Sequence, residues 1–342
     1  MSKSTNNKSR ALGRVTLSDV ARLASVAPMT ASRAINQPEL VSSLLRERVD
    51  KAVQELGYVP NRAARALASA RSRVIVVLVP SLSNAVFTAV LAGIQDALDP
   101  ANYQILLGNT RYSDADEEKL LATYMQSNPD GILLSGLTHS DRVRQILEQS
   151  RVPVVSMMDL APGHDVMSVG FSQVDAGYAM TRYLLDKGHR RIGYMGAQLD
   201  ERTLKRAEGY RKAMHKAGLA DPALELLAPE PSSIALGAEM LGRMLDRTPG
   251  LDAIFCCNDD LAHGAIYQCQ RRGISVPGQL AICGFNDLPA SAWMKPSVTT
   301  VGTPLYRIGF EAASLLLASI RGSEAPARRI DLGFTLLARE SA

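Results

Sequence analysis

The stretch TLSDVARLASVAPMTASRAIN, residues 16–36, predicts two short helices joined by a tight turn. Thr16 is a residue type that caps helices, and Asp19 three positions later completes a box-like start. The apolar residues that follow recur at helical spacing and form one face: Leu17, Val20, Ala21 and Ala24. A break at residues 25–27 separates this helix from the next.

The second helix is predicted over residues 28–35, and Pro28 is tolerated at its first position. The pattern turns Ala31, Ala34 and Ile35 inward and leaves Met29, Thr30, Ser32 and Arg33 outside. Two short helices of this kind are typical of the helix-turn-helix motif, whose second helix enters the major groove of DNA. A helical hairpin without a role in DNA binding gives the same pattern, so these residues alone leave both interpretations open.

Basic residues are concentrated at the start of the chain. Residues 1–73 hold 13 Lys and Arg against 5 Asp and Glu, a net charge of +8, whereas the remaining chain holds 25 against 29. Most of the 13 lie in or beside the predicted helices, and the others lie in the tail: Lys3, Lys8, Arg10 and Arg14. A basic segment joined to a mildly acidic body favours a polyanion as partner, and therefore favours DNA binding.

The bulk composition excludes several classes of protein. The 342 residues, 46% hydrophobic and 21% charged, are enough for two or three globular domains. No apolar run approaches the ~20 residues that span a bilayer, and the polar start MSKSTNNKSR lacks the apolar core of a secretory signal. The chain has four cysteines, Cys256, Cys257, Cys269 and Cys283. They form no CxxC pair, and no set of histidines has the spacing of zinc ligands. We therefore expect buried thiols in a reducing cytoplasm, without disulfides or a metal site.

A third helix and a basic segment follow. Ser42 is a plausible cap, and Gly57 is placed to end a helix whose apolar stripe is Leu45, Val49, Ala52, Val53 and Leu56. The next segment, YVPNRAARALASARSR at residues 58–73, is separated by Pro60 and is too short for a stable isolated helix. It is either a plain linker or a helix that forms only on DNA, with Leu67 inserted between base steps of the minor groove.

From Val74 onward, apolar runs typical of buried parallel strands alternate with amphipathic segments of helical length. Strands are predicted at residues 74–79, 104–108, 131–136, 152–158, 191–196, 253–258 and 280–285. Helices are predicted near residues 84–99, 113–127, 173–187, 201–217, 234–246, 258–272 and 304–320. This alternation predicts doubly wound parallel sheets, and roughly 270 residues are too many for one such sheet, so we expect two similar subdomains.

Ligands of such sheets bind beyond the carboxyl ends of the strands. The polar residues expected there are Ser81, Asn84, Thr138, His139, Asp159, residues 200–206, Asn258, Asp259, Asn286 and Asp287. Arg202, Lys205 and Arg206 form a cationic cluster that suits a carboxylate or phosphate. A solvated helix start balanced by Asp200 and Glu201 is the alternative.

Enzyme motifs are poor. The chain has no GxSxG nucleophile elbow and no GxGxxG fingerprint. Gly131 and Gly136 have phosphate-loop spacing, but Leu137 and Thr138 replace the required Lys-Ser/Thr pair. We therefore expect a protein that is not an enzyme and needs no cofactor.

The whole chain resembles the LacI/GalR family of bacterial transcriptional repressors. Besides residues 16–36, the matching motifs are LGYVPNRAARALA, GHRRIGYMG, RAEGY, CNDDLAHGA, GISVPGQLAICGFND and VTTV, in family order over residues 15–340. Within the family, VPSLSNAVF, GAQLDERT and DLGFTL look most like gluconate-operon repressors. The resemblance implies a small all-α helix-turn-helix domain followed by an α/β domain of two lobes, similar to periplasmic sugar-binding proteins.

The resemblance also implies domain bounds and site residues. We expect a disordered basic tail at 1–14, the helix-turn-helix domain at 15–58, a hinge helix or linker at 59–73 and an effector-binding and dimerisation domain at 74–342. Its N-lobe would comprise about 74–171 and 303–330, and its C-lobe about 172–302 and 331–342. Implied DNA contacts are Thr16, Pro28, Met29, Thr30, Ser32, Arg33, Asn36, Tyr58, Asn61, Arg62, Ala64 and Leu67. Implied effector contacts are Ser81, Phe87, Asp159, Arg202, Lys205, Arg206, Asn258, Asn286, Asp287 and Thr303.

Two positions depart from the family pattern. Gly is usual where Ser25 stands, and if that turn needs φ > 0, Ser costs on the order of 1 kcal/mol. Ser or Thr is usual where Ala27 stands, so the second helix loses a side-chain cap worth ~1 kcal/mol. Because Pro28 has no backbone donor, Met29 and Arg33 remain the main candidates for contacts to base edges.

The sequence thus predicts a cytoplasmic, nucleoid-associated homodimeric repressor of sugar-acid catabolism genes that binds double-stranded operator DNA and no membrane. A gluconate-type effector between the lobes would release it from the operator. Arg206, alone or together with Lys205 or Arg202, would hold the effector carboxylate. The alternatives within the family are 2-ketogluconate, a neutral sugar or a purine as effector. A binding protein without DNA would share the lobes, but the basic segment 1–73 argues against it.

Overall fold

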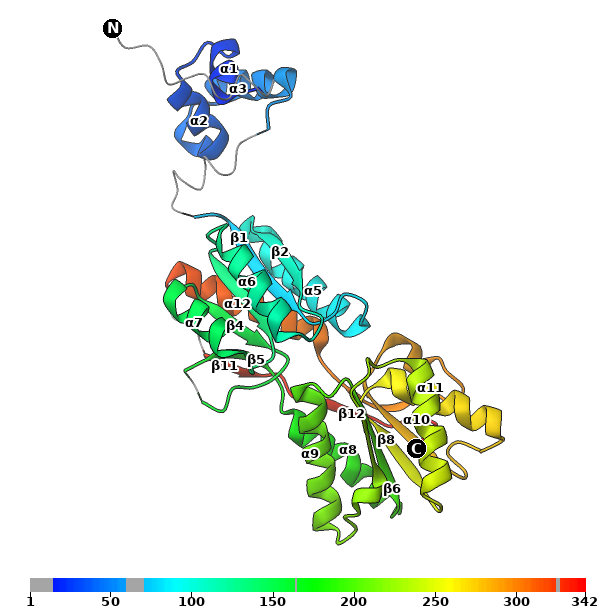
Figure 1. Cartoon of the computed structure of the whole chain (residues 1–342). Coiled ribbons are helices and arrows are strands. Elements are labelled where there is room, and N and C mark those ends of the chain that lie inside the picture. Colours follow the sequence, from blue (N-terminus) through cyan, green and yellow to red (C-terminus); the bar gives the residue numbers. More distant parts are fainter. Residues whose placement is uncertain (1–14, 60–70, 164, 324–326) are drawn as a thin grey trace. The chain divides into compact units, whose positions relative to one another are not determined.

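The computed structural model of the chain describes residues 15–59, 71–163, 165–323 and 327–342. It divides into two compact units, Met1–Ser72 and Arg73–Ala342 (Figure 1). No helix in these described ranges is long and apolar enough to cross a membrane. All four cysteines are buried and unpaired, which confirms the expectation of buried thiols.

The described residues 15–59 of the first unit form three short helices, α1 (Leu17–Leu23), α2 (Pro28–Asn36) and α3 (Ser43–Leu56), with a 3₁₀ turn, η2 (Pro38–Leu40), between the last two. Small apolar residues predicted from the helical spacing form its core: Val20, Ala24, Ala34, Val49 and Ala52. The side chains are small enough for close helix packing, so a compact core forms from few residues.

The ends of these helices largely follow the sequence prediction. The Asp19 carboxylate accepts the Thr16 N–H at 3.0 Å and the Thr16 hydroxyl at 2.7 Å, which confirms the box-like start of α1. Gly57 ends α3 in the left-handed conformation at φ 61°. Ser42 occupies the N-cap position of α3, but its side chain makes no capping hydrogen bond.

The turn between α1 and α2 contains both departures from the family pattern. Ser25 has φ 52°, so the position does require the left-handed conformation that glycine adopts at least cost. Ala27 is the N-cap of α2 and offers no side-chain acceptor to the first helical N–H groups. Both predicted costs therefore apply in this turn.

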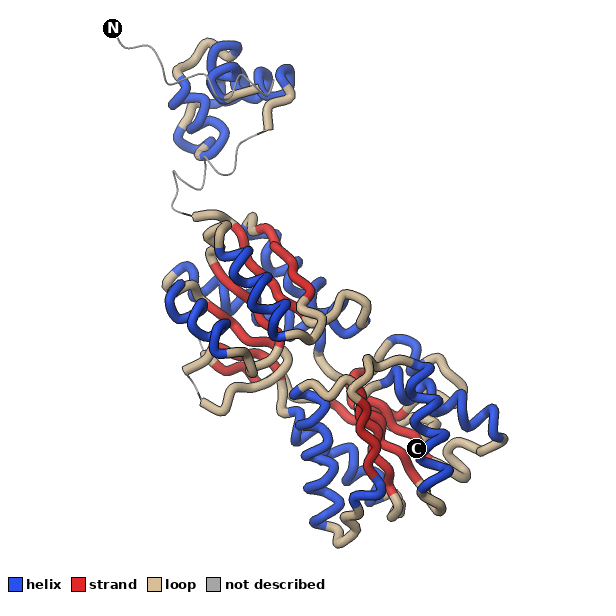
Figure 2. The backbone as a smooth tube through the Cα atoms, in the orientation of Figure 1, coloured by secondary structure: helices blue, strands red, loops and turns tan. Residues whose placement is uncertain are grey.

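The second unit contains two six-stranded sheets (Figure 2). The first has the order β11-β5-β4-β3-β1-β2, with β1 Val74–Val79, β2 Gln104–Asn109, β3 Gly131–Ser135, β4 Val154–Met157, β5 Met167–Gly170 and β11 Arg329–Asp331. The second has the order β12-β10-β9-β8-β6-β7, with β6 Ile192–Ala197, β7 Glu225–Ala228, β8 Ala253–Cys256, β9 Ala281–Asn286, β10 Thr299–Gly302 and β12 Thr335–Leu337. Neighbouring strands are parallel except for β10 and β12. The predicted class of two doubly wound sheets is confirmed.

Helices flank each sheet and define two lobes. The N-lobe is the first sheet with α5 (Ala85–Leu98), α6 (Asp114–Met125), α7 (Asp141–Ser150) and α12 (Leu305–Arg321). The C-lobe is the second sheet with α8 (Gln173–Asp186), α9 (Glu201–Lys216), α10 (Ile234–Arg247) and α11 (Asp259–Arg272). Short 3₁₀ turns lie at Asp99–Ala101, Pro222–Leu224 and Pro289–Ala292. The chain crosses between lobes three times, after β5, β10 and β11.

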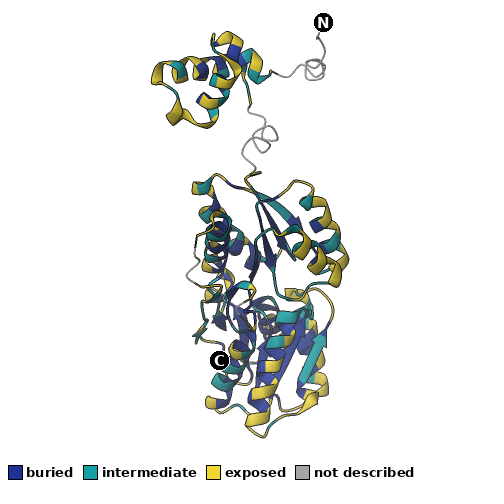
Figure 3. Ribbon diagram, turned by 90° about the vertical axis from the view of Figure 1, so that its left-hand side faces the viewer, coloured by how far each residue is buried: buried dark blue, intermediate teal, exposed yellow. Residues whose placement is uncertain are grey.

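The seven strands and seven helices predicted from the sequence are confirmed, whereas β5, β7, β10, β11, β12 and α7 were not predicted. Those strands are three or four residues long and, unlike the equally short β4 and β8, do not belong to longer apolar runs of the sequence. The α7 sequence DRVRQILEQS is mostly polar, and Val143 is its one buried residue. In Figure 3 the strands of the second unit are largely buried, while the outer faces of its helices are exposed.

Three helix pairs pack backbone against backbone through glycines. A methyl group on Gly209 of α9 would lie 2.1 Å from the Val174 carbonyl oxygen of α8. A methyl group on Gly309 of α12 would lie 2.0 Å from the Val90 carbonyl oxygen of α5. Each pair places one such glycine on each helix: Gly93 and Gly309, Gly177 and Gly209, Gly237 and Gly264. No side chain fits at these crossings, so each pair is held at a fixed close distance.

Candidate functional site

The outer face of α2 carries the residues expected to contact DNA. Met29 is 66% exposed, which is unusual for a large apolar side chain, and Arg33 is exposed one turn later. Pro28 is exposed as well, while Thr30 and Ser32 are half-buried. The Asn36 amide donates to the Ser32 hydroxyl at 3.4 Å along the helix. This face therefore presents an apolar group, an arginine and short polar groups together.

The other predicted DNA contacts lie away from this face or outside the described residues. Thr16 is half-buried at the start of α1, and Tyr58 packs against the core of the helical unit. The remaining four predicted contacts fall outside the described residues: Asn61, Arg62, Ala64 and Leu67.

A pocket of about 340 Å³ lies between the lobes of the second unit. Its N-lobe lining comprises Pro80, Ser81, Ser83, Asn84, Val86, Phe87, Asn109, Arg111, Tyr112 and Met158. Its C-lobe lining comprises Ala197, Gln198, Asp200, Arg202, Thr203, Arg206, Pro231, Ser232, Asn258, Asp260 and Asn286. The volume falls in the range of small-molecule sites, and the lining is rich in polar groups.

Six of the ten predicted effector contacts line this pocket: Ser81, Phe87, Arg202, Arg206, Asn258 and Asn286. The other four make contacts elsewhere. Asp159 pairs with Lys205 at 2.5 Å, and Asp287 pairs with Arg339 at 2.7 Å. The Thr303 hydroxyl donates to the Asn286 carbonyl at 3.2 Å, so it supports a lining residue from behind.

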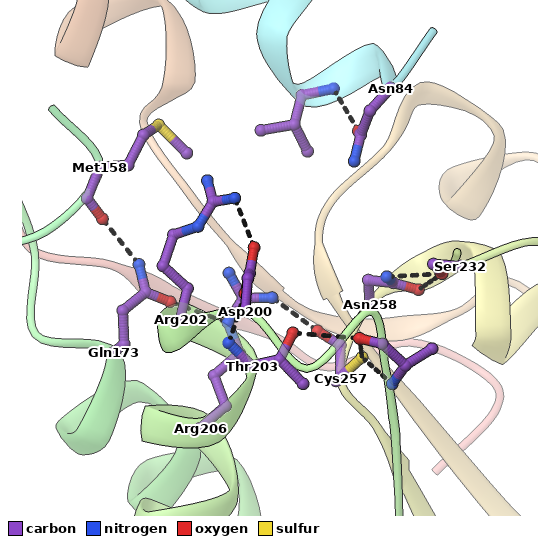
Figure 4. Close-up of polar contacts among 12 residues, drawn as sticks. Asn84, Met158, Gln173, Asp200, Arg202, Thr203, Arg206, Ser232, Cys257 and Asn258 are labelled. Atoms are coloured by element: carbon purple, nitrogen blue, oxygen red, sulfur yellow. Dashed lines mark hydrogen bonds and ion pairs between the residues drawn. The ribbon is translucent and has the colours of Figure 1, made fainter. Parts of the chain in front are cut away.

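Arg206 is the most buried of the three predicted cations, at 6% exposure. Its Nε donates to Gln173 Oε1 at 2.8 Å, and its Nη1 donates to the Cys257 carbonyl at 2.6 Å (Figure 4). The guanidinium carbon lies 3.7 Å from the ring centre of Phe285. Within the described part of the chain Arg206 has no carboxylate partner, and burial lowers its pKa. A buried, unneutralised guanidinium at a pocket wall favours an anionic ligand.

Arg202 is neutralised within the protein. Its Nη2 lies 2.6 Å from Asp200 Oδ2, and its guanidinium lies over the Phe87 ring at 5.3 Å. Burial would raise the pKa of Asp200, but Arg202 and the Thr203 N–H outweigh it and lower that pKa to about 2. Arg202 and Asp200 therefore form a stable ion pair at the pocket wall.

Lys205 is neutralised as well. Its Nζ lies 2.5 Å from Asp159 Oδ2 and 2.7 Å from Glu201 Oε1. Burial alone would lower the pKa of Lys205, but the hydrogen bonds that its ammonium group donates to Asp159 and Glu201 raise it. Arg202 and Lys205 are thus paired with carboxylates of the protein, whereas Arg206 is not. Arg206 is therefore the cation suited to the carboxylate of a ligand.

Polar side chains opposite and beside Arg206 suit hydroxyl groups. Asn258 caps α11 by accepting the Leu261 N–H at 3.1 Å, and its amide donates to the Ser232 hydroxyl at 2.7 Å. Polar lining residues that the predicted effector set omitted are Ser83, Asn84, Asn109, Arg111, Tyr112, Gln198, Asp200, Thr203, Ser232 and Asp260. Asn84 and Asp200 carried a signal, since both follow strand ends in the sequence. Asn109 is the last residue of β2, and Thr203 and Asp260 lie in the first turns of α9 and α11. The others lie in loops, where a single sequence gives no pattern.

A buried aspartate fixes the loop that carries Asn286. Asp259 Oδ1 accepts the Thr300 hydroxyl at 2.7 Å, and its Oδ2 accepts the Leu288 N–H at 2.6 Å. Asn286 and Asp287 both have positive φ, 107° and 57°. Burial raises the pKa of Asp259. Its hydrogen bonds stabilise a loop of costly backbone conformation, and so orient Asn286 toward the pocket.

The chain matches two family models. The model for bacterial regulatory proteins of the lacI family matches residues 16–61, which include the whole helix-turn-helix stretch. The model for a periplasmic binding protein-like domain matches residues 181–342, which include most of the C-lobe.

Relatives and solved structures cover nearly all of the chain. It is 48% identical over 342 residues, and 100% of both chains, to the HTH-type transcriptional regulator GntR of Pseudomonas aeruginosa. A crystal structure of the transcription regulator GntR from Chromobacterium violaceum is 53% identical, with a TM-score of 0.77 over 78% of this chain and 98% of that one. A LacI family regulator from Silicibacter pomeroyi is 35% identical, with a TM-score of 0.88 over 96% of this chain and 99% of that one.

Proposed function

This chain belongs to the lacI family of bacterial regulatory proteins, and from that premise we propose that it represses sugar-acid catabolism genes and leaves its operator when a gluconate-type effector binds between the lobes. It is a transcriptional repressor rather than an enzyme, as its full-length relative is a transcriptional regulator. Its DNA site, its effector and its oligomeric state form the proposal.

The DNA part of the proposal is supported by α2 and by charge. Met29 and Arg33 are exposed together on α2, the second helix of the motif, which in helix-turn-helix proteins enters the major groove. An exposed arginine can form two hydrogen bonds with guanine, worth about 1–3 kcal/mol of discrimination. Because residues 1–73 carry a net charge of +8, phosphate contacts would make operator binding strongly dependent on salt.

The homodimer is supported by exposed apolar side chains on the second unit. Trp293 is 90% exposed, Leu82 is 53% exposed and Tyr306 is 44% exposed. Large apolar side chains gain free energy when a second subunit removes them from water, so these residues suit a subunit interface. A dimer would place one α2 in each half-site of a near-palindromic operator.

The observation that carries the effector proposal is that Arg206 is buried at the pocket wall without a carboxylate partner among the described residues. A neutral sugar or a purine would leave the buried guanidinium without a counter-charge, which costs free energy. A sugar acid would place its carboxylate on Arg206 and its hydroxyls among Asn258, Ser232 and Asn286. Gluconate and 2-ketogluconate both meet this requirement, and the pocket of about 340 Å³ is large enough for either.

Calorimetry and operator binding test the proposal together. We expect gluconate to bind the full-length chain and to weaken operator binding, measured by fluorescence anisotropy at several salt concentrations. Arg206→Met should abolish gluconate binding and leave operator binding intact. Lys212→Met, an exposed cation on the same helix, is the matched control and should respond as the wild type does. Full gluconate affinity in Arg206→Met would refute the carboxylate assignment.

A further inference from the structure

Gln173 joins the pocket to the place where the chain first crosses between the lobes. Strand β5 ends at Gly170 in the N-lobe, and Gln173 is the first residue of α8 in the C-lobe. Its side chain is 1% exposed and makes two hydrogen bonds, one on each side of this crossing. Gln173 does not itself line the pocket, so a direct contact with the ligand does not explain its buried amide.

The two hydrogen bonds use opposite ends of one amide group (Figure 4). Gln173 Oε1 accepts from Arg206 Nε at 2.8 Å, on the C-lobe side. Gln173 Nε2 donates to the Met158 carbonyl at 2.8 Å, on the N-lobe side. Because the amide is planar, a rotation that follows Arg206 also moves Nε2 relative to the Met158 carbonyl. The two bonds therefore change together.

A second link between the lobes lies directly beside the first. Lys205, the neighbour of Arg206 on α9, pairs with Asp159, the neighbour of Met158, at 2.5 Å. Adjacent residues of α9 thus contact adjacent residues of the N-lobe, Lys205 directly and Arg206 through Gln173. Of these two links, the one through Gln173 begins at a residue that lines the pocket. Arg202, which also lines the pocket, contacts the N-lobe by its position over the Phe87 ring and is already neutralised by Asp200.

The packing of α8 on α9 favours transmission along this link. A methyl group on Gly177 of α8 would lie 2.4 Å from the Arg206 carbonyl oxygen, so the two helices touch at the Arg206 backbone itself. The helices consequently move as one body, and a ligand that shifts the Arg206 side chain changes its bond to Gln173 rather than the helix spacing.

We propose that Gln173 is a positioning residue that couples occupation of the Arg206 anion site to the relative orientation of the two lobes. This inference rests on the proposed effector site at Arg206. A carboxylate bound to Arg206 reorients the guanidinium and its Nε, the Gln173 amide follows, and the bond to the Met158 carbonyl is altered. Loss of Gln173 therefore weakens the response of operator binding to effector without removing the effector's own contacts.

The test separates effector affinity from coupling. Gluconate affinity is measured by calorimetry on the full-length protein, and operator affinity by anisotropy with and without saturating gluconate. The ratio of the two operator affinities is the coupling factor, which is typically about 5–150-fold in allosteric proteins. In Gln173→Met, a substitution of similar size without the amide, we expect this factor to fall toward 1 while gluconate affinity changes only a few-fold.

Thr181→Val is the matched control. Thr181 is a fully buried polar residue on the same helix, and its hydroxyl bonds only within α8, to the Gly177 carbonyl at 2.9 Å. Its coupling factor should equal that of the wild type. A Gln173→Met protein that keeps the wild-type factor overturns the proposal, even if its stability or gluconate affinity is reduced.

A second variant covers the case in which Gln173→Met does not fold. Gln173→Asn keeps the amide but is too short to bond both Arg206 and Met158, so its coupling factor should also fall, and a wild-type factor in this variant overturns the proposal. If the wild-type chain does not bind gluconate, the proposed effector is wrong and this inference is overturned with it. If the wild type responds to gluconate and both Gln173 variants respond equally well, only the coupling role is overturned.

Discussion

Arg48 of α3 holds the strained turn residue Ser25 in place. Its Nη2 donates to the Ser25 carbonyl at 3.2 Å and to the preceding Ala24 carbonyl at 2.5 Å. Ser25 has φ 52°, a conformation that L-residues adopt at a cost. A side chain from the third helix therefore stabilises the turn between α1 and α2.

Ser25→Gly should stabilise the helix-turn-helix unit by about 1 kcal/mol, because glycine adopts positive φ without steric cost. Hydrogen exchange of the α1–α3 amides in the full-length protein measures this local stability. Ser42→Gly is the control, because Ser42 has φ −58° and glycine relieves no strain there, so its local stability should not increase. Equal exchange rates in Ser25→Gly and the wild type would contradict the assigned strain.

Ala27→Ser should add the missing cap of α2. Ala27 has φ −68° and ψ 148°, an extended conformation in which a serine hydroxyl can accept a helix N–H. The expected gain is ~1 kcal/mol, read from the same exchange experiment. Ala24→Ser, at a buried position of the same unit, should destabilise instead and serves as the control.

Arg33→Ala should reduce the preference for operator over random DNA by about 1–3 kcal/mol, because a contact to a base edge would be lost. Competition anisotropy with both DNAs measures the preference, and gluconate binding should be unchanged. Arg46 is an exposed arginine of α3, and Arg46→Ala should leave the ratio of operator affinity to random-DNA affinity unchanged. An unaltered ratio in Arg33→Ala would exclude Arg33 from base recognition.

The Asp200–Arg202 pair should make stability depend on pH. The pKa of Asp200 in the folded chain, about 2, lies below its ordinary value of 3.8. The ionised carboxylate therefore stabilises the fold above about pH 4, by on the order of 2 kcal/mol, and this contribution is lost as the pH falls toward 2. Asp200→Asn keeps the cap but lacks the charge, so it should be less stable at pH 7 and match the wild type near pH 2.

Urea denaturation between pH 2 and pH 7 measures this difference. Asp221→Asn is the control, because Asp221 also caps a helical turn, through the Ala223 N–H at 2.9 Å. A stability difference between Asp200→Asn and the wild type that does not change with pH would show that the charge of Asp200 has no such effect.

The sequence predicted the long elements and the kind of site better than the detailed contacts. Arg202, Lys205 and Arg206 lie at spacings that put them on one helical face, so their clustering follows from the sequence alone. Their partners do not. Asp159 neutralises Lys205 from 46 positions away, and Phe87 covers Arg202 from the other lobe. Which cation remains available therefore depends on tertiary packing, which no local pattern contains.

The same limit applies to the lining of the pocket. Asn84 and Asn258 cap helices that begin directly after strands, a local arrangement that the sequence pattern predicts. Ser232 and Gln198 reach the pocket from loops, whose course is set by what they pack against. Helix α7 and the short strands were not predicted for a related reason. Packing against the rest of the lobe stabilises them more than their own local sequence preferences do.

The six glycines at the helix crossings predict which positions of this repressor a mutational screen would find intolerant of substitution. A screen for constitutive expression selects any substitution that abolishes repression, wherever it lies. Every replacement at Gly93, Gly177, Gly209, Gly237, Gly264 or Gly309 adds atoms where a backbone carbonyl oxygen lies within 2.0–2.4 Å of the added carbon. These positions would therefore appear as intolerant as a residue that contacts DNA in a mutational map, although none of them lines the pocket or belongs to α2.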